Sequence, residues 1–106
     1  MSDHVVALST LGSAADAERI GRALVEQRLA ACVNVVPGVV SFYRWKGELQ
    51  RDQEWLLVIK TRTDALPPLR AALLALHPYE LPELVACPIV SGHEPYLRWI
   101  DESVAR

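Results

Sequence analysis

The sequence predicts an α+β protein: a ferredoxin-like βαββαβ sandwich with sheet order 4-1-3-2, an extended hairpin between the second and third strands, and a C-terminal helix. Short runs rich in β-forming residues alternate with two amphipathic segments of helical period, in the order strand, helix, strand, strand, helix, strand. The second and fourth strands contain Pro37 and Pro88, and proline is tolerated mainly in edge strands. A length of 106 residues predicts one domain, 1–106.

The first strand and the first helix are predicted from the N-terminal part of the chain. Val5–Thr10 is a short apolar run, which is typical of a buried strand. Ser13 is followed three residues later by Asp16, a loose capping box that predicts the start of a helix. The helix is expected to end near Arg28. Its apolar face is formed at helical spacing by Ala17, Ile20, Gly21 and Leu24.

A long hairpin is predicted next. Ala31–Trp45 is expected to form a strand bent at Pro37-Gly38, and Glu48–Arg62 is expected to be the returning strand. Lys46-Gly47 fits a two-residue turn between them, although less well than Asn-Gly. The end of the hairpin, from Ser41 to Gln53, is more polar than the rest and is expected to project beyond the sheet.

The C-terminal part predicts a second helix, a fourth strand and a short third helix. Thr63 or Asp64 is expected to cap the second helix. Pro78 disfavours helical geometry at His77, so this helix is expected to end there. Leu84–Val90 is expected to be the fourth strand. The terminal helix is marked by Tyr96, Trp99 and Ile100.

The predicted strands are apolar on both faces, which indicates that the chain associates with copies of itself. Right-handed crossovers place both long helices on one face of the sheet. In the third strand, Leu57 and Ile59 point to one face and Leu56 and Val58 to the other, whereas a solvated face should be polar. Burying about four such side chains favours association by roughly 6–12 kcal/mol before association costs. The alternative is that the C-terminal helix alone covers the second face, and periodicity does not distinguish a dimer from a trimer.

Composition argues against nucleic acid, membranes and secretion. The 11 basic and 13 acidic residues are interspersed without a basic stripe, so nucleic acid is not an expected partner. The longest apolar stretch, Leu29–Val40, is interrupted and too short to span a bilayer, so no membrane association is expected. Met1–His4 lacks the basic and apolar regions of a signal peptide, which predicts a cytoplasmic protein.

The two cysteines, Cys32 and Cys87, fit neither a zinc-binding nor a redox spacing. They are expected to be reduced, buried thiols of a cytosolic protein. The predicted strand order places them on opposite edges of the sheet, about 14 Å apart. A disulfide between them is incompatible with that topology.

Six side chains are candidate metal ligands. Imidazole and thiolate suit copper or zinc, and soft sulfur favours Cu(I). No CxxC, HxxxH or HExxH spacing places two of the six on a common face, and no cofactor is expected to be required. For His77 the alternative is that the imidazole only ends a helix and interacts with the last carbonyl groups. The six are His77, Glu80, Glu83, His93, Cys32 and Cys87.

A second set of candidates predicts a ligand cleft formed by Tyr79, Glu80, Lys60 and Trp45. Two prolines stiffen the loop that contains Tyr79 and Glu80, and loops of fixed shape often present binding groups. Glu80 and Lys60 are expected to form an ion pair in a cleft between subunits that accepts a small charged ligand. The alternative is that Tyr79, Trp45 and Trp99 are packing anchors and that Glu80 is paired for structural reasons.

Catalysis is a further alternative, with Cys32 as a nucleophile and His77 as its base. Cys32 lies in an apolar run without a cationic neighbour in sequence, so its thiol is expected to be inert. Ser9 lacks nucleophile-elbow glycines, and a Gly-rich phosphate loop is absent from the sequence. The sequence therefore predicts a protein that is not an enzyme.

Five segments resemble, in the same order, the CutA family of divalent-cation-tolerance proteins. Together they extend over nearly the whole chain, and their combination is specific although each alone is short. The segments are Ala30–Gly38, Ser41–Gly47, Ile59–Thr61, His77–Glu83 and Tyr96–Ile100.

This resemblance implies a homotrimer in which long hairpins join the sheets of neighbouring subunits, with an architecture similar to that of the trimeric PII signalling proteins. It implies a non-enzymatic role in tolerance of copper and other divalent cations. In the family, copper is associated with a cysteine near the end of the first strand and a histidine before the Pro-Tyr segment; here these positions hold Ser9 and His77. The alternative is a PII-like signalling or scaffold trimer that binds a small anionic ligand or a partner protein. Its subunit clefts would be lined by Trp45, Lys60, Tyr79, Glu80 and Trp99.

Overall fold

The computed structural model describes residues 3–105 and contains the predicted order of strands and helices. Met1 and Ser2, part of the segment from which a cytoplasmic protein is predicted, lie outside the described residues. None of the helices within residues 3–105 combines the length and the apolar character needed to cross a bilayer. The elements are β1 (His4–Leu11), α1 (Ala14–Glu26), β2 (Cys32–Trp45), β3 (Glu48–Arg62), the 3-10 helix η1 (Thr63–Ala65), α2 (Leu66–Leu76), β4 (Val85–Pro88) and α3 (Glu94–Ser103).

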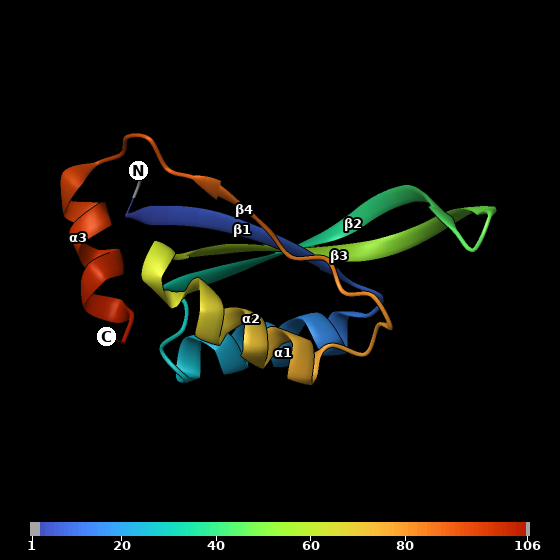
Figure 1. The fold of residues 1–106 in the computed structure, drawn as a ribbon, viewed down its shortest axis with the longest axis horizontal. Coiled ribbons are helices and arrows are strands. Elements are labelled where there is room, and N and C mark those ends of the chain that lie inside the picture. The colour runs from blue at the N-terminus through green and yellow to red at the C-terminus, as the bar shows by residue number, and fades with distance from the viewer. Residues whose placement is uncertain (1–2, 106) are drawn as a thin grey trace.

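The four strands form one antiparallel sheet in the order β2-β3-β1-β4, which confirms the predicted order read from the other edge. Figure 1 shows α1 and α2 together on one face of the sheet and the β2–β3 hairpin extending beyond it. The proline-containing strands β2 and β4 are the edges, where a missing N–H is tolerated. The β2–β3 ladder is irregular between Val36 and Val39, so the predicted bend at Pro37-Gly38 is confirmed.

The structure confirms the predicted cap of α1 and the predicted hairpin turn, and it corrects the predicted cap of α2 and the predicted length of the fourth strand. The Ser13 hydroxyl accepts the Asp16 N–H at 3.1 Å and caps α1, as predicted. Lys46 and Gly47, with φ of 50° and 81°, form the two-residue turn of the hairpin. Neither Thr63 nor Asp64 caps α2, because both lie in η1. The fourth strand is Val85–Pro88 and is shorter than the predicted Leu84–Val90, because its pairing with β1 spans only residues 85–88.

The core lies between the sheet and the helices α1 and α2. Ala7, Leu57 and Ile59 point from the sheet into this layer and are fully buried. Gly21 of α1 lies so close to β2 that a Cβ there would be 3.2 Å from Cγ1 of Val33. This close approach lets the side chains of α1 and α2 pack on the sheet and complete the core. The helix residues in the core are chiefly Ile20, Leu24, Leu69 and Leu73.

The face of the sheet opposite α1 and α2 is apolar, as the alternation predicted. Strand pairing puts Val6, Leu8, Leu56 and Val58 on this face, where all are half-buried. We call these residues, with Val36 and Val85, the open face; Val36 and Val85 extend it to the two edge strands with 39% and 52% of their surface exposed. One chain therefore covers only one side of its sheet with helices.

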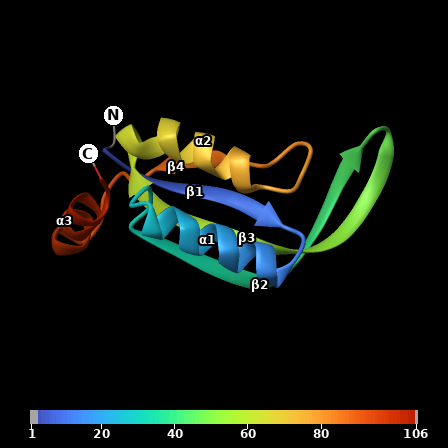
Figure 2. The same cartoon turned by 90° about the horizontal axis from the view of Figure 1, so that it is seen from below.

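The C-terminal helix α3 packs across the end of the sheet and leaves the open face uncovered, as Figures 1 and 2 show from two directions. Ile100 and Val104 form a small cluster with Ala31 and Ala65, separate from the main core. The alternative in which α3 alone covers the second face is therefore wrong. The reason is that the apolar side of α3 finds its partners where β2 begins and β3 ends.

Polar contacts hold α3 in this position. Oδ1 of Asp101 in α3 lies 2.9 Å from Nε2 of His4 and 3.9 Å from Nε of Arg62. The Arg62 side chain is 6% exposed and also pairs with Asp64 of η1. The guanidinium of Arg28 donates to the carbonyl oxygen of Glu102 at 2.9 Å. Charges from β1, β3 and the α1–β2 loop thus fix the helix at the sheet end.

Both cysteines are free, and the register confirms that they lie on opposite edges of the sheet. Cys32 pairs with Lys60, Lys60 with Val6, and Val6 with Cys87, which places the two thiols in one row across the whole sheet. The prediction that both thiols are buried is wrong. Cys87 is exposed and Cys32 is half-buried, because both face the side without helices.

Candidate functional site

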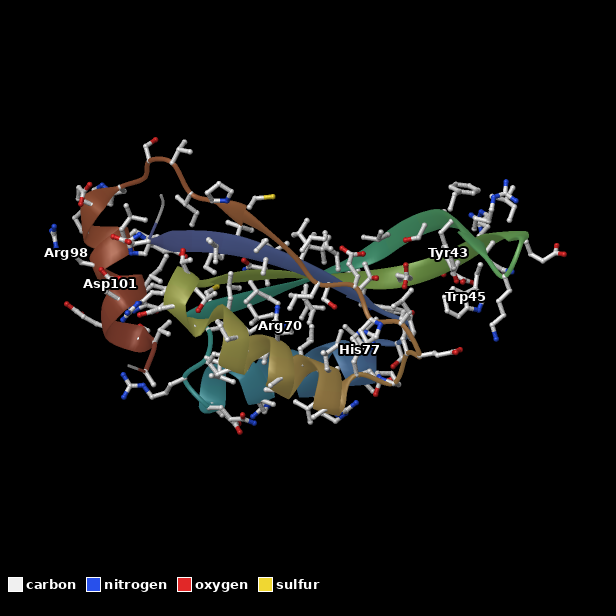
Figure 3. All side chains as sticks on the ribbon, viewed as in Figure 1. Tyr43, Trp45, Arg70, His77, Arg98 and Asp101 are labelled. Atoms are coloured by element: carbon white, nitrogen blue, oxygen red, sulfur yellow. The ribbon has the colours of Figure 1, made fainter. Side chains whose placement is uncertain are left out.

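A cavity of about 760 Å³ lies between the β2–β3 hairpin and the loop from α2 to β4. This volume falls in the range of pockets for small molecules. Figure 3 shows Tyr43 and Trp45 on the hairpin and His77 at the start of the loop, all toward the same end of the molecule. We call it the hairpin cavity; its principal side chains are Tyr43, Trp45, Glu54, Tyr79, Glu80 and Glu83.

His77 anchors the loop side of the hairpin cavity. Its backbone N–H donates to the carbonyl of Leu73 at 2.9 Å, the last bond of α2. In the ring, Nε2 lies 2.9 Å from the carbonyl oxygen of Thr10, and Nδ1 lies 3.1 Å from the backbone nitrogen of Tyr79. Because a carbonyl only accepts, Nε2 carries the proton and Nδ1 accepts the Tyr79 N–H. Both nitrogens are engaged and the residue is 8% exposed, which supports the structural interpretation of His77.

Tyr79 connects this loop to β3. Its hydroxyl donates to Oε2 of Glu54 at 2.7 Å, and its ring lies 4.7 Å from the His77 ring, centroid to centroid. Burial, followed by the bond to Glu54, raises the pKa of the Tyr79 hydroxyl. A Cβ on Gly12 would lie 3.1 Å from the Tyr79 hydroxyl oxygen, so glycine leaves room for the ring. The side chain of Glu54, a residue only 6% exposed, is thereby held in place at the cavity wall.

The hairpin supplies the opposite wall. The Tyr43 hydroxyl donates to Asp52 across the hairpin, a bond that raises the Tyr43 pKa. The Lys46 ammonium lies 5.7 Å from the centroid of the Trp45 ring and 3.9 Å from Oε2 of Glu80. An ammonium group therefore already touches both an aromatic ring and a carboxylate at the edge of this cavity.

The pKa values of the three tyrosines are raised above the usual value of about 10. Burial is the main cause for Tyr79 and Tyr96, and the bond to Asp52 is the main cause for Tyr43. Because the folded state holds the protonated form, its stabilisation is complete below pH 10 and is lost as pH rises above it. Tyrosinate absorbance at pH 10 should therefore be lower in the native protein than in the protein unfolded in urea, where about half of the tyrosines are ionised. Equal ionisation of the two states at that pH would contradict the contacts described above.

The remaining predicted cleft residues lie far from the hairpin cavity. Lys60 lies on β3 beside Val6, near the end that α3 covers, and donates to Asn34. Trp99 lies on α3, 42% exposed, and stacks on Tyr96 with 5.3 Å between ring centroids. Figure 2 shows α3 and the hairpin at opposite ends of the molecule, whose longest dimension is 44 Å. Within one chain the predicted site is therefore split in two.

The predicted Glu80–Lys60 ion pair does not form within one chain. Glu80 pairs with Lys46, and Lys60 lies four positions along β3 from Leu56, the partner of Thr10 at the cavity. At about 3.3 Å per residue this distance exceeds the reach of an ion pair. A pair between two subunits stays a prediction.

Sequence reasoning missed Glu54, the most buried acidic residue of the cavity. The one available signal was its position directly before the apolar run of β3, where a charged residue needs a partner. The partner, Tyr79, is 25 residues further along the chain, and no local pattern connects the two.

The candidate metal ligands do not converge within one chain. Among residues 3–105, no group of three or more His, Cys, Asp or Glu side chains could hold a metal ion. The Cys32 thiol lies 3.8 Å from the side-chain oxygen of Asn34, near the end of the sheet opposite His77. His93 precedes α3 and Cys87 lies on β4, both distant in the fold from the cavity that Glu80 and Glu83 line. The donors of one chain therefore do not fit a complete metal centre.

Comparison with known proteins gives concordant results. The family model described as CutA1 divalent ion tolerance protein matches residues 5–103. The chain is 54% identical over 98 residues to the divalent-cation tolerance protein CutA of Thermus thermophilus. This alignment covers 92% of this chain and 95% of that protein. It is 46% identical over 84 residues to the human protein CutA, and this alignment covers 79% of this chain and 47% of the human protein. The chain thus spans nearly all of the bacterial relative and about half of the human one.

Solved structures agree over nearly the whole chain. The structure of the divalent cation tolerance protein from Thermus thermophilus aligns with a TM-score of 0.94 at 52% identity, covering 96% of this chain and 99% of that one. The structure of CutA from Xylella fastidiosa aligns with a TM-score of 0.95 at 43% identity, covering 98% and 100%. These similarities confirm the ferredoxin-like fold.

Proposed function

The chain belongs to the CutA1 divalent ion tolerance protein family, and from this membership we propose that it is a non-enzymatic homotrimer that supports the tolerance of divalent cations. The observation that carries the proposal is the open face. Its six apolar side chains lie on the side of the sheet that the chain's own helices leave uncovered. A neighbouring subunit that covers them removes this apolar surface from water.

The extended hairpin supports a closed ring of subunits. It projects past the sheet with an exposed Phe42 and Leu49, 66% and 71% accessible, which gain from packing on a neighbour. The predicted cleft residues also divide between two ends of the chain, Trp45, Tyr79 and Glu80 at one and Lys60 and Trp99 at the other. In a head-to-tail ring, one end of each subunit meets the other end of the next, so both groups would line one cleft.

A second candidate function is a signalling or scaffold trimer that binds a small ligand or a partner protein at these clefts. The hairpin cavity favours it, because the cavity is preformed and rich in aromatic side chains. An anionic ligand is disfavoured by charge, since Glu54, Glu80 and Glu83 line the cavity with Arg44 as the cation among its lining residues. A partner protein or a ligand without negative charge agrees better with this lining.

A direct contact with copper or another divalent cation is a further part of the proposal. Of the two predicted ligands, Cys32 is the better donor, since its thiol is half-exposed and its contact to Asn34 is long, at 3.8 Å. His77 would have to give up its bonds to Thr10 or Tyr79. Because one chain brings no three donors together among the described residues, a full coordination shell would need several chains. We also propose a cytoplasmic location, because an exposed free thiol such as that of Cys87 is best preserved in a reducing compartment.

Titration of the purified protein with Cu(I), Cu(II) and Zn(II) tests the direct contact. We expect Cu(I) binding to weaken at least tenfold in Cys32→Ser and to stay unchanged in His77→Gln, which keeps a donor for the Thr10 carbonyl. Cys87→Ser is the matched control, because it removes the thiol at the opposite edge of the same row. Binding weaker than roughly millimolar for all three ions, or loss only in His77→Gln, would contradict a Cys32 contact.

A further inference from the structure

We propose that the hairpin cavity binds a small organic cation, an alkylammonium or quaternary ammonium compound, held between its aromatic rings and its carboxylates. This inference is independent of metal tolerance, and all the residues that carry it belong to one chain. It rests on the charge of the cavity, on the arrangement of its rings and on a contact that the chain makes with its own ammonium group.

The charge of the cavity favours a cation. Glu54, Glu80 and Glu83 contribute three carboxylates, and Arg44 contributes one guanidinium. Glu54 is 6% exposed, so its charge acts in an environment that water screens poorly. The bond from Tyr79 occupies Oε2 of Glu54 and leaves Oε1 as an acceptor for a ligand. A positive group that enters the cavity compensates a carboxylate that is already partly desolvated.

The rings of the cavity favour an organic cation over a metal ion. Tyr43, Trp45 and Tyr79 come from two different segments and line the same space. Aromatic faces attract ammonium groups through the ring quadrupole, most strongly for tryptophan, and they provide no ligand atoms for a metal. A cavity of about 760 Å³ also exceeds what a bare ion requires and accommodates the carbon body of an amine.

Lys46 demonstrates this recognition within the molecule. Its ammonium lies 5.7 Å from the centroid of the Trp45 ring and 3.9 Å from Oε2 of Glu80. Both side chains of the Lys46–Glu80 pair are about three-quarters exposed, at 72% and 73%, so the pair is weak and can be displaced. A free ammonium compound would use the same two kinds of contact deeper in the cavity, with Glu54 in addition.

The test uses the full-length protein and three probes at constant ionic strength: choline, spermidine and, as the anionic counterpart, succinate. Isothermal calorimetry should detect binding of at least one of the two cations and weaker or absent binding of succinate. Glu54→Gln keeps the shape and the acceptor for Tyr79 but removes the charge, and should weaken cation binding about tenfold. Trp45→Ala should have a similar effect, and Arg22→Ala, on the exposed side of α1 where the Arg22 side chain is 80% accessible, should have none.

Lys46→Ala separates this proposal from an anionic site. Removal of the internal ammonium frees Glu80 and the Trp45 ring, so cation binding should become several-fold tighter, whereas an anionic ligand would bind less well. If Glu54→Gln does not fold, the exposed Glu80→Gln replaces it, with an expected loss of about threefold.

Three results would overturn the proposal: succinate binding as tightly as the cations, cation binding that Glu54→Gln and Glu80→Gln leave unchanged, or no binding of either cation at 10 mM, roughly the weak limit of specific recognition. The oligomeric state of every variant is measured in parallel. Loss of ligand binding with an intact trimer refutes only the ligand site, and a monomeric wild-type protein refutes only the proposed assembly.

Discussion

Val58→Asp is expected to convert the proposed trimer into separate subunits. Val58 lies in the middle of the open face, flanked in its row by Asn34 of β2 and Leu8 of β1. A carboxylate at this position would have to be desolvated in every subunit of the assembly, at a cost of several kcal/mol for each copy. Sedimentation equilibrium should show a trimer for the wild type and a monomer for the variant at micromolar concentration.

Val58→Thr is the matched control, because it keeps the β-branched shape and replaces one methyl group with an uncharged hydroxyl. Its assembly should weaken by about 1–3 kcal/mol, which leaves the trimer populated at micromolar concentration. An aspartate variant that sediments as a trimer would show that the open face is not the surface that the subunits bury. A wild-type protein that is a stable monomer would refute the assembly altogether.

Leu57→Ala should lower the free energy of unfolding by about 2–5 kcal/mol, the usual cost of a cavity at a leucine site. Leu57 is fully buried and points from β3 into the core that α1 and α2 cover. The side chain is enclosed on all sides, so little collapse can fill the space. Denaturant unfolding at one fixed protein concentration measures the change, because association contributes to apparent stability.

Leu49→Ala tests whether this loss depends on burial. Leu49 lies on the same strand, β3, but is 71% exposed near the hairpin turn. In the Val58→Asp background, where the subunits are expected to be separate, its removal should change the stability of the subunit by no more than about 0.5 kcal/mol. Equal losses for Leu49→Ala and Leu57→Ala would contradict the described core. A normal stability for Leu57→Ala would do the same.

Val58 and Leu57 are neighbours in sequence and face opposite sides of the sheet, so the two variants separate two kinds of burial. One should change assembly, and the other should change the stability of the subunit. The period of two along β3 makes this separation a property of the local sequence.

Much of the fold could be predicted because its signals are local. Pro37 and Pro88 indicated the edge strands, Ser13 indicated the start of α1, and Lys46-Gly47 indicated the hairpin turn; the structure confirms all three. The prediction failed at Thr63 and Asp64, which form η1 and do not cap α2. The Asp64 carboxylate pairs with the nearly buried guanidinium of Arg62, which also lies close to Asp101 of α3. Because this tertiary contact engages the Asp64 side chain, the side chain does not cap α2.

The candidate site was predicted only in part. Trp45, Tyr79 and Glu80 do meet at one cavity, whereas Lys60, Cys32 and Trp99 lie toward the other end of the chain. The sequence identified residues with binding chemistry but could not place them, since their separation depends on where each strand enters the sheet. Glu54 was missed for the same reason, because its partner lies in a loop that wraps back to the sheet.

The order of the elements, the strand order and the two apolar faces of the sheet were predictable from the chain alone. These follow from periodicity and from proline positions, which act within a few residues. Three features required the folded structure: α3 leaves the open face uncovered, Thr10 and Tyr79 engage His77, and Tyr79 of the α2–β4 loop bonds to Glu54 of β3 at the cavity wall. Such contacts join residues up to 67 positions apart, and their geometry comes from the packing of the sheet and not from any local preference of the chain.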